Sequence, residues 1–256
     1  MPQLRSAPVS YWRASRAPRY SLLFALPLLV AYEALVVLLS HGPAAGIRNG
    51  ADAILETLFS FLAGAYGPLL FGVCLVGVGA WFVVRDLRAH GRRLRWRVFA
   101  VMLLEALALA LIFGVVVSAI TTRVVAPIAH FTRTADAALV LAPVASLGWW
   151  MRLMVSIGAG LYEELLFRVI LVSGFVFIGE RLLRWRPVTA GVWAAVLSAL
   201  IFSAFHYVGP YGDPLHLRSF VFRAIAGLAF STLYLLRGFG ITAWTHALYD
   251  ILLLVV

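Results

Sequence analysis

The first long apolar run of this chain, residues 20–40, reads YSLLFALPLLVAYEALVVLLS and decides the class of fold. It contains a single charged residue, Glu33, and it is as long as the roughly 20 residues that an α-helix needs to cross a bilayer. A basic segment precedes it, as in a signal peptide, but no clear small-residue cleavage site follows. We therefore expect a retained first transmembrane helix.

The same pattern recurs along the chain and predicts an all-α, polytopic membrane helix bundle. The runs expected to span the bilayer are 20–40, 58–84, 98–120, 152–178, 188–206, 219–236 and 240–256. A shorter apolar stretch, 137–150, contains Pro143 and is expected to be interfacial or re-entrant. The prediction is thus about seven transmembrane helices, or eight if that stretch also crosses.

Composition and charge support a membrane protein and argue against a nucleic-acid-binding one. The chain is 63% hydrophobic and 12% charged, whereas a soluble domain is closer to half apolar and a quarter charged. The net charge of +10 comes from arginines that gather between the apolar runs, which is typical of loops facing anionic lipid. All 21 basic residues are arginine, and this usage indicates a GC-rich, bacterial genome. The single cysteine, Cys74, excludes an intramolecular disulfide.

The arginines also predict the orientation and the organisation of the chain. Arginine-rich segments alternate with nearly neutral ones, which by the positive-inside rule places the N-terminus in the cytoplasm and the C-terminus outside. The expected location is a bacterial inner membrane. The expected division is a cytoplasmic basic segment (1–19), three N-terminal transmembrane helices (20–120) and a C-terminal membrane core (145–256).

The fourth apolar run carries adjacent acids where lipid is expected, because from Gly158 to Arg168 it reads GAGLYEELLFR. Glu164 and Arg168 are i,i+4 neighbours on a helix and can form an ion pair. Glu163 is turned about 100° away and cannot share that arginine equally. One carboxylate would thus be neutralised and the other left free, as an acid–base catalyst requires. Gly158 and Gly160 would let a neighbouring helix approach closely.

Two later runs each carry a histidine four residues away from an aromatic or an acidic residue. The fifth ends in IFSAFH, with Phe202 and His206 on one face, and the seventh begins ITAWTHALYD, with His246 and Asp250 on one face. Each group alone has a structural explanation: an ion pair within a helix, an interfacial histidine, or a tie between two helices. Together, in otherwise apolar helices, Glu163 and these residues favour a functional site.

Other intramembrane charges are expected to lie outside that site. Glu33 and Glu105 are assigned structural or snorkelling roles, and Arg223 is expected to reach the headgroups. One difficulty concerns depth, because His206 lies at the outer end of its helix and His246 near the inner end of its own. The difference is about 15 Å, so either the helices tilt and differ in length or the turn before the last helix lies below the membrane surface.

At these residues the sequence resembles the CPBP family of CAAX-protease and bacteriocin-processing intramembrane glutamic endopeptidases. The family is marked by Glu-Glu-x-x-x-Arg, Phe-x-x-x-His and His-x-x-x-Asn/Asp motifs on successive membrane helices. The resemblance covers roughly residues 145–256, and the matching positions in family order are Glu163, Glu164, Arg168, Phe202, His206, His246 and Asp250.

The resemblance implies a hydrolase and a role for each residue. Glu163 would be the general base that activates a water with His206, and His246 with Asp250 would stabilise the oxyanion. Glu164 and Arg168, with Phe202, would support the site. Many members have Asn at the position of Asp250. An ionised carboxylate cannot donate a hydrogen bond, so Asp250 must be protonated or must orient His246, and we favour the second. No cofactor or metal is implied.

The partners implied are the lipid bilayer and a membrane-associated peptide or protein substrate. A prenylated CAAX protein is the eukaryotic association of the family, whereas a bacterial member would process a peptide or a C-terminal sorting signal. Three alternatives stay open: a zinc-dependent membrane protease, a non-catalytic binding or immunity protein of the same fold, and a transporter that uses Glu163 as a proton relay.

Overall fold

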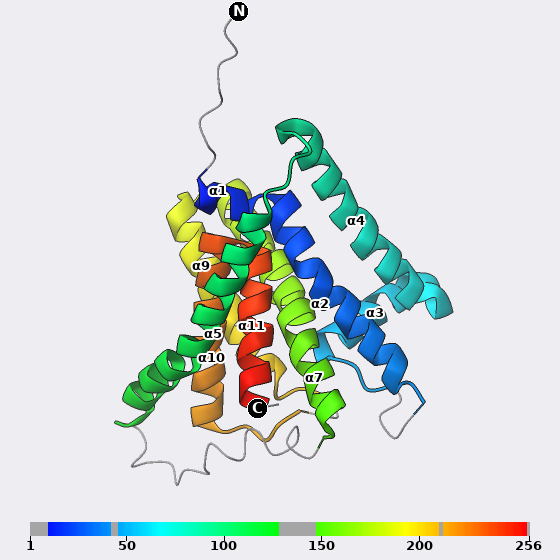
Figure 1. The fold of residues 1–256 in the computed structure, drawn as a ribbon. Coiled ribbons are helices and arrows are strands. Elements are labelled where there is room, and N and C mark those ends of the chain that lie inside the picture. Colours follow the sequence, from blue (N-terminus) through cyan, green and yellow to red (C-terminus); the bar gives the residue numbers. More distant parts are fainter. Residues whose placement is uncertain (1–9, 42–45, 128–146, 210–211, 255–256) are drawn as a thin grey trace, which may run out of the picture.

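The computed structural model describes residues 10–41, 46–127, 147–209 and 212–254, and in these ranges it contains helices and no strand (Figure 1). In chain order the elements are α1 (Tyr11–Arg16), α2 (Pro18–Leu39), α3 (Gly50–Ala63), η1 (Gly64–Tyr66), α4 (Gly67–His90), α5 (Trp96–Val125), α7 (Trp149–Gly158), η2 (Ala159–Glu163), η3 (Leu165–Val172), α8 (Ser173–Phe177), η4 (Ile178–Leu182), α9 (Pro187–Phe205), α10 (Leu217–Arg237) and α11 (Phe239–Leu254). The prediction of an all-α membrane bundle is confirmed.

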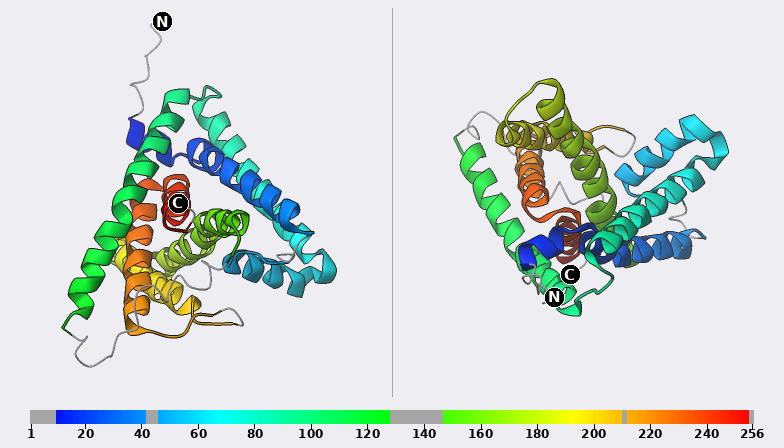
Figure 2. Two further views of the ribbon diagram at one scale, coloured as in Figure 1. Left: turned by 60° about the horizontal axis from the view of Figure 1, so that its bottom comes forward. Right: turned by 90° about the horizontal axis from the view of Figure 1, so that it is seen from above.

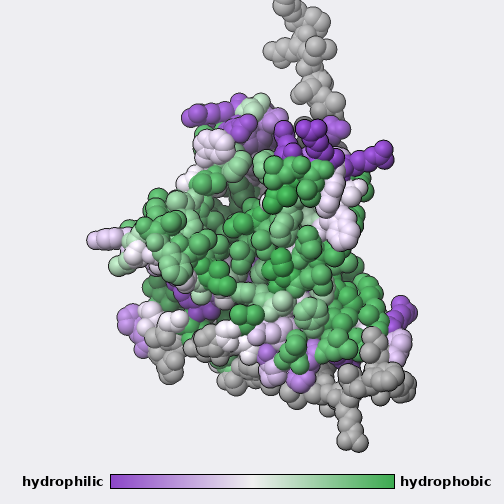
Figure 3. Space-filling view, turned by 180° about the vertical axis from the view of Figure 1, so that it is seen from behind, coloured by the Kyte–Doolittle hydropathy of each residue, from purple (hydrophilic) through white to green (hydrophobic). Residues whose placement is uncertain are grey.

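The outer surface of the bundle is apolar, as lipid contact requires. Hydrophobic residues cover the middle of the face shown in Figure 3, and hydrophilic residues lie at its two ends. By length and composition, five stretches could cross a membrane: Pro18–Leu39, Gly50–His90, Trp96–Val125, Pro187–Phe205 and Leu217–Arg237. The predicted number of spans stays a prediction, and of the stretch 137–150 only the last four residues lie within the described part of the chain.

The last helix, α11, lies at the centre of the bundle. It packs against α2, α5, α7, η2 and α10, and Figure 2 shows it surrounded by these elements. Its first half is buried, including Ala243 and Ala247, both fully inaccessible. Gly160 on η2 approaches α11 closely, because a Cβ there would lie 2.5 Å from the Ala243 carbonyl oxygen. A polar residue on this half of α11 is therefore held inside protein rather than in lipid.

The fourth predicted span is one continuous helix from Trp149 to Leu182, and part of it is not α-helical. The segments η2, η3 and η4 are π-helical, while the junction residues Ala159, Glu164 and Ser173 keep right-handed helical dihedrals. Such turns are rare in proteins overall, and those that occur are often part of a functional site. Glu163 and Glu164 lie at the junction between the first two, so their directions depart from those of an ideal α-helix.

The predicted second span, 58–84, is wrong in its boundaries. The structure has two helices there, α3 and α4, joined by the tight turn η1. Gly64 has a φ of +56°, a conformation that ends a helix and favours glycine, and Pro68 follows at the start of α4, where its missing N–H costs nothing. Residues 50–57, expected as a loop, are the beginning of α3, whose N-cap is Asn49.

The turn before α11 is buried beneath the N-terminal helix α1. The Arg237 side chain forms two hydrogen bonds of 2.6 Å with Glu105, and its guanidinium carbon lies 3.8 Å from the centre of the Trp12 ring. The backbone N–H of Gly240 donates to Ser21 Oγ at 2.8 Å. Glu105 therefore has a structural role, as predicted. α11 therefore begins inside the protein, and the depth of this turn relative to the membrane surface stays a prediction.

The close approach of Gly160 to α11 gives a test of this packing. Gly160→Ala should destabilise the protein by about 1–3 kcal/mol, since the added methyl group meets backbone atoms of α11 that cannot move aside. Gly174→Ala is the matched control on the same continuous helix, where a Cβ meets nothing within 4 Å. Thermal unfolding in detergent measures both, and equal stability of the two variants would contradict the packing described here.

Candidate active site

The buried acid Glu164 forms the link between the long helix and α11. Its Oε1 atom lies 3.1 Å from Arg168 Nη1 and 2.6 Å from His246 Nδ1. Glu164 and Arg168 are fully buried, and His246 is 5% exposed. The ion pair expected from the i,i+4 spacing is present, but Glu164 does not serve Arg168 alone, because the same carboxylate oxygen also binds His246.

Aromatic rings enclose the charge of Arg168. Its guanidinium carbon lies 4.5 Å from the centre of the Phe202 ring and 5.5 Å from that of Phe230, and Nη2 is 3.4 Å from the carbonyl oxygen of Gly227. Cation–π contacts of this kind stabilise a cation where water is absent. The phenylalanine of the Phe-x-x-x-His pattern thus contacts the arginine of the Glu-Glu-x-x-x-Arg pattern.

Glu163 has a different environment from its neighbour. Its side chain is 7% exposed, and its Oε1 accepts a hydrogen bond of 3.0 Å from Asn49 Nδ2. The carboxylate interacts electrostatically with His206 and His246, yet within the described residues it has no ion-pair partner at 4 Å or less. One acid is therefore fixed by charge, and the other is held by a neutral amide.

His206 lies directly after the last residue of α9, where its ring is oriented by its own helix. Its Nδ1 lies 2.8 Å from the Phe202 carbonyl oxygen, which can only accept, so Nδ1 carries the proton of that hydrogen bond. In the neutral ring, Nε2 is then left with a lone pair that can accept a proton. The four-residue spacing between Phe202 and His206 therefore determines the orientation of the His206 ring.

The Phe202 ring brings the two histidines together. Its centre lies 4.9 Å from that of His206 and 6.4 Å from that of His246. The Phe230 ring stacks on the His246 ring, and the two ring centres are 4.3 Å apart. The histidines of the fifth and seventh predicted spans therefore share one neighbourhood, although their positions along the two helices differ.

Asp250 lies on the other edge of the His246 ring. Its Oδ2 is 3.6 Å from His246 Nε2, longer than a hydrogen bond, and its side chain is 18% exposed. The expectation that Asp250 orients His246 stays a prediction, and a second, shorter contact to the ring comes from Glu164 at Nδ1. His246 is flanked by two carboxylates, one at each ring nitrogen.

Sequence reasoning missed two residues of this site, Asn49 and Phe230. Phe230 carries no signal, since a phenylalanine in an apolar helix is ordinary core. Asn49 does carry one, because an asparagine directly before an apolar helical run is an N-cap signature. The predicted spans 20–40 and 58–84 place Asn49 in the connection between them, which hides this signal.

The predicted surface role of Arg223 is wrong. Its side chain is 11% exposed, it forms an ion pair with Asp213, and its guanidinium carbon lies 5.1 Å from the centre of the Tyr207 ring. Asp213 in turn donates its backbone N–H to the His206 carbonyl oxygen at 2.9 Å. Arg223 thus holds the segment that follows α9 instead of reaching outward.

Glu33 belongs to a separate polar cluster at the junction of α2 and α3. It accepts a hydrogen bond of 2.6 Å from the Tyr162 hydroxyl and lies 3.7 Å from Arg48. Arg48 also pairs with Asp52 at 2.5 Å and with Glu56 at 2.9 Å. The cluster ties the α2–α3 junction to η2, which agrees with the structural role expected for Glu33.

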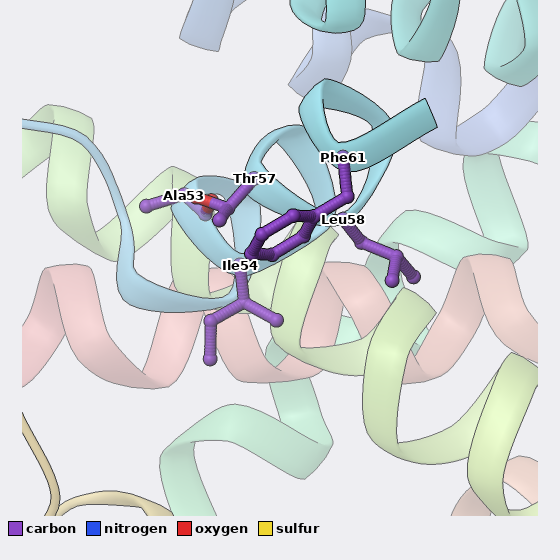
Figure 4. Close-up of a pocket in the computed structure, with 5 residues that line it drawn as sticks. All are labelled: Ala53, Ile54, Thr57, Leu58 and Phe61. Atoms are coloured by element: carbon purple, nitrogen blue, oxygen red, sulfur yellow. The ribbon is translucent and has the colours of Figure 1, made fainter. Parts of the chain in front are cut away.

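A shallow hollow on the outer face of α3 is not part of the candidate site. Figure 4 shows Ala53, Ile54, Thr57, Leu58 and Phe61 along one side of this helix. The Thr57 hydroxyl donates to the Ala53 carbonyl oxygen at 2.7 Å and is not free for chemistry. With regard to metals, no three His, Cys, Asp or Glu side chains of the described ranges are grouped as a metal site.

Comparison with known proteins agrees with the motifs. Residues 143–252 match the family model "Type II CAAX prenyl endopeptidase Rce1-like". No significant match was found among curated proteins or among solved structures. The matched segment contains the long helix, α9, α10 and most of α11, and the resemblance to the CPBP family is confirmed. Residues 143–252 of this multi-pass membrane protein therefore form an Rce1-like domain of the CPBP family of membrane proteases.

Proposed function

We propose that this protein is an intramembrane endopeptidase in which Glu163 activates a water for attack on a peptide bond of a membrane-associated protein or peptide. The observation that carries the proposal is the environment of Glu163. It is a buried carboxylate with a neutral hydrogen-bond donor, Asn49, and two histidines close enough to interact electrostatically. A general base needs such a position, in hydrogen-bond reach of water and without a permanent counter-ion.

In this mechanism Glu163 and His206 hold the water between them. The Nε2 lone pair of His206 accepts one hydrogen bond from the water, and the Glu163 carboxylate takes the other proton as the oxygen attacks the carbonyl carbon. The tetrahedral intermediate carries its negative charge on the former carbonyl oxygen. Glu163 then passes the proton to the leaving amide nitrogen, the oxyanion re-forms the carbonyl as the C–N bond breaks, and an amine and a carboxylic acid are released. The remaining proton of the acid passes to His206 Nε2 or to solvent, which leaves a carboxylate product.

His246 is the proposed donor to that oxyanion. The two ring nitrogens of His246 face Glu164 and Asp250, and in a doubly protonated ring both nitrogens can donate a hydrogen bond. Nδ1 is then committed to Glu164, and Nε2 points to the side where Asp250 and the substrate oxygen would lie. Glu164 is thus proposed to position His246 as well as to neutralise Arg168.

The substrate class and the orientation are also proposals. The matched family model is described as a CAAX prenyl endopeptidase, so a prenylated C-terminal peptide is one candidate, and a C-terminal processing or sorting signal of a bacterial membrane protein is the other. The arginine-rich ends of α1 and α4 and the start of α9 lie at one end of the bundle (Figure 1). We assign this end to the cytoplasm of a bacterial inner membrane.

A pair of substitutions distinguishes the roles of the two adjacent acids, Glu163 and Glu164. Glu163→Gln should abolish cleavage of candidate membrane peptides, including one with a prenylated CAAX end, and should leave the unfolding temperature unchanged. Glu164→Gln should cost about 3–5 kcal/mol of stability, because it leaves the buried Arg168 without its counter-ion. Activity that survives in Glu163→Gln would refute the proposed base.

Metal dependence distinguishes this mechanism from zinc catalysis. Activity should persist in EDTA and phenanthroline, and His246→Ala should lower kcat on the order of a hundredfold, as the loss of an oxyanion donor does. Asp250→Asn should retain most of the activity, because the amide keeps an acceptor beside Nε2 and adds a donor. Inhibition by chelators with recovery on adding zinc, together with stoichiometric metal in the pure protein, would favour the zinc protease.

A further inference from the structure

We propose that Asn49, which lies outside the matched domain at the junction of α2 and α3, is a positioning residue for the carboxylate of Glu163. The inference rests on the proposed function, because it assigns Asn49 a role toward the general base. It extends the active site to the N-terminal part of the chain, which matches no family motif.

The oxygen and the nitrogen of the Asn49 side-chain amide form hydrogen bonds with different partners. Oδ1 accepts a hydrogen bond of 2.9 Å from the Ala51 backbone N–H and thereby caps α3. Nδ2 donates to Glu163 Oε1 at 3.0 Å. Because the cap needs an acceptor, it determines which end of the amide carries oxygen. The nitrogen must then face Glu163, so the helix cap itself aims the donor at the acid.

The backbone of Asn49 is held by a chain of buried hydrogen bonds. Its N–H donates to the Tyr32 hydroxyl at 3.0 Å, and that hydroxyl donates to Asp52 Oδ2 at 2.8 Å. Tyr32 and Asp52 are fully buried, and Asn49 is 4% exposed. Asp52 is in turn paired with Arg48 at 2.5 Å. These residues form one connected series of hydrogen bonds that ends at the Asn49 backbone, so α2 and α3 together determine the position of Asn49.

The long helix carries Gly158 where it contacts Tyr32 and Asn49. A Cβ at Gly158 would lie 2.5 Å from Tyr32 Cε2 and 2.8 Å from Asn49 Cβ. Any side chain there would push Asn49 away from η2, which holds Glu163. The close approach predicted for this glycine therefore brings the donor of α3 to hydrogen-bond distance of the acid.

A neutral donor suits a general base better than a cation does. A cation such as Arg168 would hold a carboxylate through charge and would reduce its tendency to take a proton. The Asn49 amide fixes one oxygen of Glu163 without neutralising it. The other oxygen is then presented to the side of His206 and His246, and a base held in one orientation avoids the rate loss of a misplaced one.

Two variants separate this role from helix capping. Serine and aspartate both cap helices well, but neither has an amide donor. Asn49→Ser should therefore keep a nearly wild-type unfolding temperature, with a kcat on a farnesylated CAAX-type peptide lowered on the order of 10- to 100-fold and KM nearly unchanged. Asn49→Asp should also be slow, but its buried carboxylate beside Glu163 should lower the unfolding temperature. Asn49→Ala, which loses both the cap and the donor, should be slow and also less stable.

A second readout needs no substrate. Infrared titration can follow the protonated carboxyl band of Glu163, identified as the band that Glu163→Gln lacks. The groups facing Glu163 are His206, His246, Arg168 and Asp250, and they are unchanged in these variants. In Asn49→Ser the midpoint should move to higher pH by on the order of one unit, because a donor to the ionised form is lost. In Asn49→Asp the move should be larger, because a second carboxylate favours the protonated form.

The outcomes separate the two proposals. Wild-type kcat and a wild-type infrared midpoint in Asn49→Ser, with Glu163→Gln inactive, would overturn the role of Asn49 and leave the proposed function in place. Cleavage by Glu163→Gln would count against the proposed function. No cleavage of the farnesylated peptide by the wild-type protein would count against the prenylated substrate, and the infrared midpoint would still decide whether Asn49 acts on Glu163.

Discussion

The site depends on the single carboxylate of Glu164, which holds a cation on its own helix and a histidine on α11. Glu164 is fully buried, and Arg168 and His246 both lie within 3.1 Å of its Oε1 atom. A buried charge without such partners would cost several kcal/mol. The long helix and the central helix are therefore bound in one register, since a shift by one residue would separate the carboxylate from the ring.

That register gives the neighbouring acid its separate environment. With Glu164 committed to α11 and Arg168, Glu163 at the π-helical junction is directed to Asn49. The two glycines of the same segment permit this arrangement from opposite sides, Gly160 against α11 and Gly158 against Tyr32 and Asn49. Adjacent residues of one type thus acquire different partners, as acid–base catalysis within an apolar bundle requires.

The N-terminal helices contribute more than membrane anchoring. The α2–α3 junction supplies a hydrogen-bond donor to Glu163 and a cluster of charges around Arg48, while α1 and α5 bury the turn that precedes α11. His246, in the middle of α11, lies in the same neighbourhood as His206, at the end of α9. The Rce1-like domain is in this way completed by elements outside it.

The sequence by itself determined the membrane class, most helix boundaries and the family, because apolar length and four-residue spacings are local properties that need no knowledge of partners. It also indicated the Glu164–Arg168 pair, which lies within one helix. Only the tertiary structure decided that Glu164 also binds His246, that Arg223 turns back to Asp213, and that Asn49 reaches Glu163. These contacts join residues on different elements, and their existence depends on how deeply each helix begins and on where glycines let backbones approach, which helical periodicity does not encode.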